Sequence, residues 1–334
     1  MALLVGIDEA GYGPHLGPLV VAGSAIAFDS DTAPDAALWG AMRGHVRRRV
    51  GGRSDRVVIC DSKQAYAGGR REKGLAVLER AVLGFLESAG IRPRTLADLL
   101  AAVGVKSSER APVATGDSTG RAEPWDDPDG LALPVRAEPE RIAEAAGALA
   151  KGFAVLGGRA GRLWVSLTPA SRLNRLMDGG GRNKASALFA VTAELLADVR
   201  RWRPAEPIFA TMDQHGGRRY YGRLLAGAFP MHRVETLEES AERSRYRLAG
   251  AETFLDLTVC QKAESSSLAV ALASMAAKYV RELVMGQLNA YFQARLPNLA
   301  PTAGYGLDAW RFLAEVRSAQ AEADIPIDMI LRSR

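Results

Sequence analysis

The chain has 334 residues, of which 48% are hydrophobic and 24% charged, and its formal net charge is +5. Nearly half of the chain can therefore contribute to a core, and the modest positive charge is a mild indication of polyanionic partners. There is no apolar run of membrane-spanning length and no charged-then-apolar leader with a cleavage site, so we expect a soluble, cytoplasmic protein with no membrane partner. Cys60 and Cys260 lie in apolar, strand-like runs, which predicts buried, reduced thiols.

Residues 3–28 read as a strand, a turn and a second strand. The apolar first run ends at two adjacent carboxylates, Asp8 and Glu9, and four glycines and two prolines surround the turn that follows. A carboxylate at the end of a buried strand is unfavourable unless it is solvated, paired or bound to a cation. Because successive strand residues point to opposite faces, Asp8 and Glu9 can share a target only where the strand frays. A metal site and a merely polar strand end both remain open.

The next elements are short. Residues 35–50 can form a helix that ends in three arginines, Arg47 to Arg49, which is typical of a solvated face and less often of a nucleic-acid patch. Residues 56–60 predict a strand that runs directly into the turn Asp61-Ser62-Lys63, and residues 75–86 have the spacing of an amphipathic helix. Residues 104–134 are rich in Pro, Gly, Ser and acidic side chains and predict a mobile surface insertion.

The middle of the chain alternates again between helix and strand patterns. We expect a helix over 141–156, a strand over 162–167 and a helix over 185–199. The glycine cluster at 178–184 resembles a phosphate-binding loop, but it lacks the Gly-Lys-Ser/Thr ending, so a plain loop before a helix is the better interpretation.

The last third repeats the pattern of a strand that leads to a carboxylate. Residues 207–212 form an apolar run before Asp213, and residues 253–260 form another before Glu264. A charged stretch at 235–247 predicts an insertion with helical character, and long helices are expected over 268–292 and 308–322. The pattern predicts one α/β domain over 1–334, a central mixed β-sheet flanked by helices, with surface insertions at 104–134 and 216–250.

Four acids therefore lie at or just beyond three predicted strand ends: Asp8, Glu9, Asp213 and Glu264. If these ends are neighbours in one sheet, mutual repulsion would raise some of the carboxyl pKa values. Divalent cations would turn the same crowding into a binding site, because Mg²⁺ and Mn²⁺ prefer oxygen ligands. Two such ions about 4 Å apart would suit in-line attack on a phosphodiester.

The motifs GIDEAGYGP-HLGPLVVA, CDSK, TMD and KAESSSLAVALASMAAKY resemble, in this order, those of the type 2 ribonucleases H, the ribonuclease HII and HIII family. The resemblance extends over most of the chain. It implies an RNase H-like fold and metal-dependent hydrolysis of the RNA strand of RNA–DNA hybrids, with two Mg²⁺ or Mn²⁺ ions during catalysis and a hybrid as the partner of a monomer. The family's metal-binding, catalytic acids fall on Asp8, Glu9, Asp213 and Glu264.

The substrate contacts implied by the resemblance fall on three segments. The family's glycine loop, which approaches the ribose 2′-hydroxyl, corresponds to Gly11-Tyr12-Gly13, where Tyr12 replaces a cation. Ser62 and Lys63 match the Asp-Ser-Lys turn, with Lys63 on a phosphate, and Tyr305 matches a tyrosine that packs on a ribose.

Two alternatives to a hybrid-specific ribonuclease remain open. One is a nuclease of the same fold that acts on DNA or another structured nucleic acid, and the other is a protein that binds hybrids without cutting them. Tyr12 and the insertions motivate the first of these, whereas the presence of all four acids argues against the second.

Overall fold

The computed structural model describes residues 1–51, 55–67, 71–105, 123–179, 183–250 and 253–333. Within these ranges the central sheet has seven strands in the order β5-β2-β1-β6-β9-β8-β7. In chain order the strands are β1 (Ala2–Ala10), β2 (Leu19–Phe28), β5 (Gly158–Thr168), β6 (Ile208–Asp213), β7 (Arg233–Glu239), β8 (Arg243–Ala249) and β9 (Phe254–Cys260). Strands β1, β6 and β9 are parallel neighbours, and the other pairings are antiparallel. The predicted mixed α/β class is therefore confirmed.

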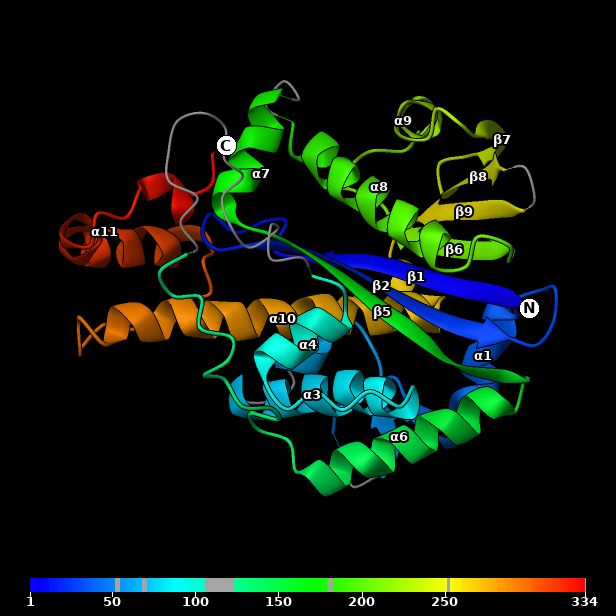
Figure 1. Ribbon diagram of the computed structural model, residues 1–334, viewed down its shortest axis with the longest axis horizontal. Coiled ribbons are helices and arrows are strands. Elements are labelled where there is room, and N and C mark those ends of the chain that lie inside the picture. Colours follow the sequence, from blue (N-terminus) through cyan, green and yellow to red (C-terminus); the bar gives the residue numbers. More distant parts are fainter. Residues whose placement is uncertain (52–54, 68–70, 106–122, 180–182, 251–252, 334) are drawn as a thin grey trace.

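Helices cover both faces of this sheet (Figure 1). On one face lies α8 (Lys184–Trp202), with α7 (Ala170–Gly179) and α9 (Gly222–Ala228) beside it. The helices of the opposite side are α1 (Asp35–Ala41), α2 (Ser62–Ala67), α3 (Arg71–Ser88), α4 (Leu96–Ala102), α6 (Pro139–Ala154) and α10 (Leu268–Gln293). Helix α11 (Gly306–Glu322) lies at the end of the molecule where α10 finishes. The sheet thus carries a separate apolar core on each face.

The alternation of β1 explains this division of the core. Leu3, Val5 and Ile7 pack with the residues of α8, whereas Leu4 packs with those of α10 and α3. Gly6 also faces α10, where an added Cβ would lie 2.0 Å from the carbonyl carbon of Ala269. A glycine is required at this position because α10 approaches the backbone of β1 so closely. Helix α10 is thereby fixed directly behind the strand that carries Asp8.

One predicted element is wrong. The stretch 235–247 was expected to be helical, but it belongs to the antiparallel hairpin of β7 and β8 at the sheet edge. Along β8, Ser244, Tyr246 and Leu248 are buried and their neighbours are more exposed, which is the period of a strand. Because this stretch carries many charged residues, the alternation of apolar and polar residues that is typical of a strand was not recognisable in the sequence. The hairpin extends the sheet beyond β9.

Two further expectations need correction near the start and middle of the chain. The helix predicted over 35–50 ends at Ala41 and continues as a 3-10 turn (Met42–Gly44) and the short strand β3 (Val46–Arg47), which pairs in parallel with β4 (Val57–Val58). Of the predicted insertion 104–134, residues 106–122 lie outside the described residues. Trp125 is only 4% exposed and packs on Phe292 of α10, so this part of the stretch belongs to a core.

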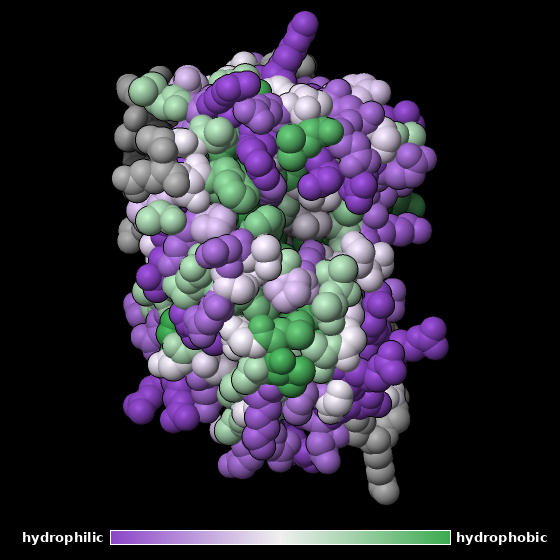
Figure 2. Space-filling view, turned by 90° about the vertical axis from the view of Figure 1, so that its right-hand side faces the viewer, coloured by the Kyte–Doolittle hydropathy of each residue, from purple (hydrophilic) through white to green (hydrophobic). Residues whose placement is uncertain are grey.

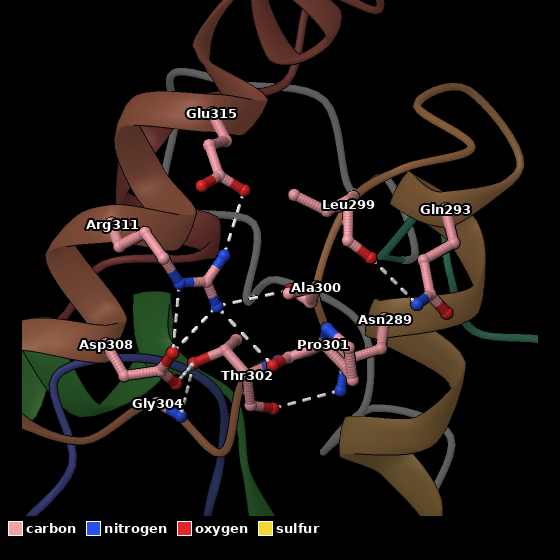
Figure 3. A network of polar contacts seen from close by, with 10 residues as sticks. All are labelled: Asn289, Gln293, Leu299, Ala300, Pro301, Thr302, Gly304, Asp308, Arg311 and Glu315. Atoms are coloured by element: carbon pink, nitrogen blue, oxygen red, sulfur yellow. Dashed lines mark hydrogen bonds and ion pairs between the residues drawn. The ribbon is translucent and has the colours of Figure 1, made fainter.

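The molecular surface is mixed in character. Hydrophilic side chains predominate on the face shown in Figure 2, and apolar side chains gather there in small patches. None of the helices in the described ranges is both long enough and apolar enough to span a bilayer. Near the start of α11, a polar network of Thr302, Asp308 and Arg311 fixes the preceding turn (Figure 3).

Candidate active site

Asp8 and Asp213 lie on the same face of neighbouring parallel strands. Ile7 of β1 pairs with Met212 of β6, and both of these side chains belong to the core on the α8 side. The next residue on each strand, Asp8 and Asp213, therefore faces α10. The Asp8 carboxylate accepts a hydrogen bond from the amide of Glu9 (2.8 Å), and Asp213 accepts one from the amide of Ala263 (3.0 Å). The predicted convergence of these two strand ends is present in the fold.

Glu9 and Glu264 come from different local structures. Strand β1 continues to Ala10, so Glu9 is still in the strand ladder and the strand does not fray at these two residues. The carboxylates of Asp8 and Glu9 nevertheless come close enough for each to change the pKa of the other. Glu264 follows β9 on a 3-10 turn (Ala263–Ser265), which Lys262 begins in a left-handed conformation with φ 52°. This turn redirects the chain from β9 toward α10 and places Glu264 within the electrostatic influence of Asp213. We call Asp8, Glu9, Asp213 and Glu264 the acid edge.

The charges of the acid edge act on one another. Burial raises the pKa of Asp8 well above its usual value, and repulsion by Glu9 and Asp213 raises it further. Burial and the charge of Asp213 together raise the pKa of Glu9 to about 7. The pKa values of Asp213 and Glu264 are also raised, chiefly by burial, and Asp213 adds to the shift of Glu264. Asp213 thus lies at the electrostatic centre of the four carboxylates.

The chemistry of these donors fits a hard divalent cation. Four carboxylates that repel one another become favourable neighbours when a divalent ion lies between them. The described residues contain no group of three or more His, Cys, Asp and Glu side chains already close enough together to hold a metal ion. Binding would therefore require the carboxylates to draw closer by side-chain rotation, with water completing the coordination.

The predicted Asp-Ser-Lys turn lies beside the acid edge. Lys63 is exposed on α2, and its charge lowers the carboxyl pKa values of Glu9, Asp213 and Glu264. Ser62 is buried, and its Oγ lies 3.0 Å from the Oγ of Ser274 on α10. Lys63 thus offers a positive charge to whatever anion approaches these carboxylates.

Two further polar residues, Ser274 and Asp61, lie at this site and were not among the predicted site residues. Ser274 hydrogen-bonds to Asp8 and to Ser62, and so connects α10 with β1 and α2. Its position as a hydroxyl within the long apolar run of α10 was the available signal. Asp61 accepts a hydrogen bond from the amide of Gln64 (2.9 Å) at the start of α2, and its charge also raises the pKa of Glu264. Asp61 is thus a fifth carboxylate near the acid edge.

Gly11, Tyr12 and Gly13 follow β1 in a loop that also contacts the predicted Tyr305. Gly11 has φ +89°, and an added Cβ would lie 2.6 Å from the Arg281 side chain, so this position needs glycine. A Cβ on Gly13 would lie 3.8 Å from the ring of Tyr305, which is 45% exposed. Tyr12 lies within the influence of Glu9 and Arg218. The loop thus joins the acid edge to the turn before α11.

Two buried arginines fix this loop from behind. Arg281 of α10 donates hydrogen bonds to the carbonyl oxygens of Leu16 and Pro18, each at 3.2 Å, and its guanidinium lies 5.6 Å from the ring centroid of Tyr305. Arg332 donates to the carbonyl oxygens of Gly17 and Gly11. Neutral backbone oxygens thus hold both guanidinium groups, and the loop position depends on α10 and on a segment more than three hundred residues later.

A cavity of about 330 Å³ opens beside Glu264. Its walls combine Asp61 and Glu264 with Arg48 and Arg49. The cavity therefore presents both carboxylates and guanidinium groups.

Comparisons with known proteins find only distant similarity. No protein-family model and no curated protein sequence matches the chain. The solved structure of the PCNA:RNase HII complex from Archaeoglobus fulgidus gives a TM-score of 0.41 at 18% identity, over 99% of this chain and 94% of that one. Ribonuclease H2 from Pyrococcus horikoshii OT3 gives 0.42 at 14% identity, over 99% and 92%. Bst-RNase HIII in complex with Mn²⁺ gives 0.41 at 17% identity, over 99% of this chain and 66% of that one.

Proposed function

We propose that the protein is a metal-dependent endoribonuclease that hydrolyses the RNA strand of RNA–DNA hybrids. The observation that carries the proposal is the acid edge, where the ends of the parallel neighbours β1 and β6 and the turn after β9 present carboxylates beside an exposed lysine. Burial, together with the charge of Asp213, raises the pKa values of Asp8, Glu9 and Glu264. Such an arrangement is unfavourable by itself and becomes favourable when divalent cations are bound. The sequence motifs that resemble type 2 ribonucleases H lead to the same four residues.

In this proposal the carboxylates of Asp8, Glu9, Asp213 and Glu264 hold the metal. Two bound Mg²⁺ or Mn²⁺ ions would supply an activated water and Lewis-acid stabilisation of the leaving oxygen. Asp213 contributes most to the shared site because it influences each of the other three carboxylates. The hydrogen bond from the amide of Ala263 keeps its carboxylate oriented before the metal binds.

The remaining predicted residues would position the nucleic acid. Lys63 is exposed beside the acid edge and can pair with a backbone phosphate. Gly11 and Gly13 lack side chains, which lets a ribose approach the backbone of the loop. The exposed ring of Tyr305 can pack on the sugar next to the scissile bond, with Arg281 supporting it from behind. Ser62 connects the lysine turn to α10 through Ser274.

The test is a cleavage panel with matched variants. The wild-type protein with Mg²⁺ or Mn²⁺ should cut a labelled RNA–DNA hybrid and leave 5′-phosphate ends, and it should cut duplex DNA and single-stranded RNA far more slowly. Asp213→Asn should lower the rate on the hybrid by about 10³-fold or more while hybrid binding is retained. Asp256→Asn is the control, because Asp256 pairs with Arg247 at 2.7 Å, away from the acid edge.

The panel also separates the alternatives. Faster cutting of duplex DNA would favour a DNA nuclease of the same fold, for which Tyr12 in the glycine loop is the motivating residue. Tight hybrid binding without turnover in Mn²⁺ would favour a binding protein. If Asp213→Asn and Glu264→Gln both cleave the hybrid at near wild-type rates, the assignment of the acid edge as the active site would be wrong. A duplex with a single ribonucleotide tests whether Tyr12 permits that substrate.

A further inference from the structure

Three neighbouring cavities lie on the side of the sheet that α1 and α6 cover, and arginines line all of them. The largest, of about 550 Å³, is lined by nine residues that include five arginines and no carboxylate. A second, of about 300 Å³, shares Arg47 with it, and the cavity beside Glu264 shares Arg48 and Arg49. The shared residues make the three cavities one continuous surface. We call its arginines the arginine track: Arg43, Arg47, Arg48, Arg49, Arg56, Arg80, Arg136 and Arg141.

We propose that the arginine track binds the phosphate backbone of the nucleic acid outside the acid edge. The inference rests on the proposed function, since it extends the path of the same substrate. Several guanidinium groups along one surface suit a polyanion such as a phosphate backbone better than an isolated anion. One end of the track opens beside Glu264, which is where a strand held for cleavage must pass.

Neutral groups orient Arg48, which belongs to both the central cavity and the cavity beside Glu264. Arg48 stacks over the ring of Trp39 at 4.6 Å and donates to the carbonyl oxygen of Ser265. Arg47 donates to the carbonyl oxygen of Gly51, and Arg56 to that of Arg43 (3.2 Å). A carbonyl oxygen fixes a guanidinium group without neutralising its charge. Arg48 is therefore oriented in advance by contacts that do not neutralise its positive charge.

The backbone beneath the track is firmly packed. Val46, Val57 and Val58 are buried in the core on the α10 side, and β3 and β4 pair through them. The far end of the track differs from its centre, because Arg141 pairs with Glu144 at 2.9 Å and with Asp55 at 3.4 Å. Phosphate binding should therefore be strongest at the central cavity and weaker toward Arg141.

The experiment compares two double variants with equal changes of charge. Arg43→Gln with Arg49→Gln removes two exposed arginines of the central cavity. Arg203→Gln with Arg317→Gln is the control, because both arginines are exposed and lie outside the track. Melting temperatures of both variants should match that of the wild type, since none of the four side chains is buried.

Binding is measured by fluorescence anisotropy in EDTA, so that no cleavage occurs, with a long hybrid, a DNA duplex of the same length and a short hybrid. We expect the track variant to bind both long duplexes about tenfold to thirtyfold more weakly at low salt. The slope of log K against log salt should fall in magnitude by about 2, close to 0.9 for each lost phosphate contact. The short hybrid and the control variant should change less than about twofold.

The outcomes distinguish this inference from the proposed function. If the salt slope of the track variant equals that of the wild type, or if the control variant loses as much affinity, the proposed role of the arginine track would be wrong. This holds even if the protein cleaves the hybrid. Binding of poly-glutamate as tight as that of the duplexes would also overturn it, because carboxylates would then satisfy the surface. If the wild-type protein does not cleave the hybrid but the track variant still shows the expected decrease in salt slope, the proposed ribonuclease function would be wrong. The arginine track would then still be a nucleic-acid-binding surface.

Discussion

The protein places carboxylates inside its structure in two contrasting ways. Glu79 of α3 is fully buried, and it accepts hydrogen bonds from the amides of Val135, Arg136 and Ala137 at 2.6 to 2.7 Å and from the hydroxyl of Tyr279 at 3.1 Å. This charge is satisfied by fixed protein donors. In the acid edge, by contrast, negative charge meets negative charge. The first arrangement stabilises the fold, whereas the second is unfavourable for the fold unless a cation offsets the repulsion.

Removal of the Glu79 carboxylate should give the largest change in stability. Glu79→Ala leaves three backbone amides and the buried hydroxyl of Tyr279 without their acceptor, and we expect the free energy of unfolding to fall by about 3 to 5 kcal/mol. Urea denaturation at pH 7 measures the change. Glu79→Gln keeps one acceptor oxygen and should lose less. Asp213→Asn, which relieves repulsion, should change the free energy by less than about 1 kcal/mol. Equal decreases in the free energy of unfolding for the Glu79 and Asp213 variants would contradict this difference between the two kinds of carboxylate.

Added metal should stabilise the folded protein through the acid edge and not through Glu79. At about one hundred times the dissociation constant, Mg²⁺ or Mn²⁺ should raise the free energy of unfolding by about 2.7 kcal/mol, since only the folded state presents the four carboxylates together. Thermal unfolding with and without a chelator detects this shift. Asp213→Asn should lose most of it, whereas Glu79→Gln should retain it. A melting temperature that neither metal changes would contradict the assignment of the acid edge as a metal site.

Asp35 is an intermediate case between the fully hydrogen-bonded Glu79 and the carboxylates of the acid edge. Its substitution should change the stability less than the loss of the Glu79 carboxylate or the binding of metal. Burial raises its pKa from 3.8 to about 6, although Ser267 and Thr211 hydrogen-bond to the carboxylate, and one of its oxygens has no partner among the described residues. The folded state therefore holds the proton more tightly, and stability falls as pH rises from about 4 through 6. Asp35→Asn should be about 2 kcal/mol more stable than wild type at pH 7, and this gain should vanish below pH 4. A gain that is independent of pH would exclude this explanation.

Local patterns predicted the central elements well. The apolar runs before Asp8, Asp213 and Glu264 are strands β1, β6 and β9, and their parallel pairing follows from the fold class. The predicted roles of these acids stay a prediction. Burial of charged or polar residues could not be predicted, because it depends on distant partners. Arg281 is buried although it lies on a helix with charged neighbours, since the carbonyl oxygens that it binds belong to residues 16 and 18.

The charged stretches were the least predictable. Residues 235–247 carry enough charge to look like a solvated helix, yet they pair as strands because Tyr246 and Leu248 complete the core beside β9. His215 lies two residues after Asp213, in a polar stretch that follows β6. It is 2% exposed and packs near Phe189 and Tyr221, and burial lowers its pKa to about 3. Its neutral ring thus belongs to the core on the α8 side.

The hydrogen bonds from Arg332 to Gly11 and Gly17 have a consequence for biosynthesis. Strands β1 and β2 leave the ribosome early and can pair at once, because domains tend to fold from the N-terminal side during translation. The loop between them, however, waits for a donor that is translated more than three hundred codons later. A growing chain therefore displays its first two carboxylates beside a loop that lacks one of its hydrogen-bond donors until residue 332 has emerged.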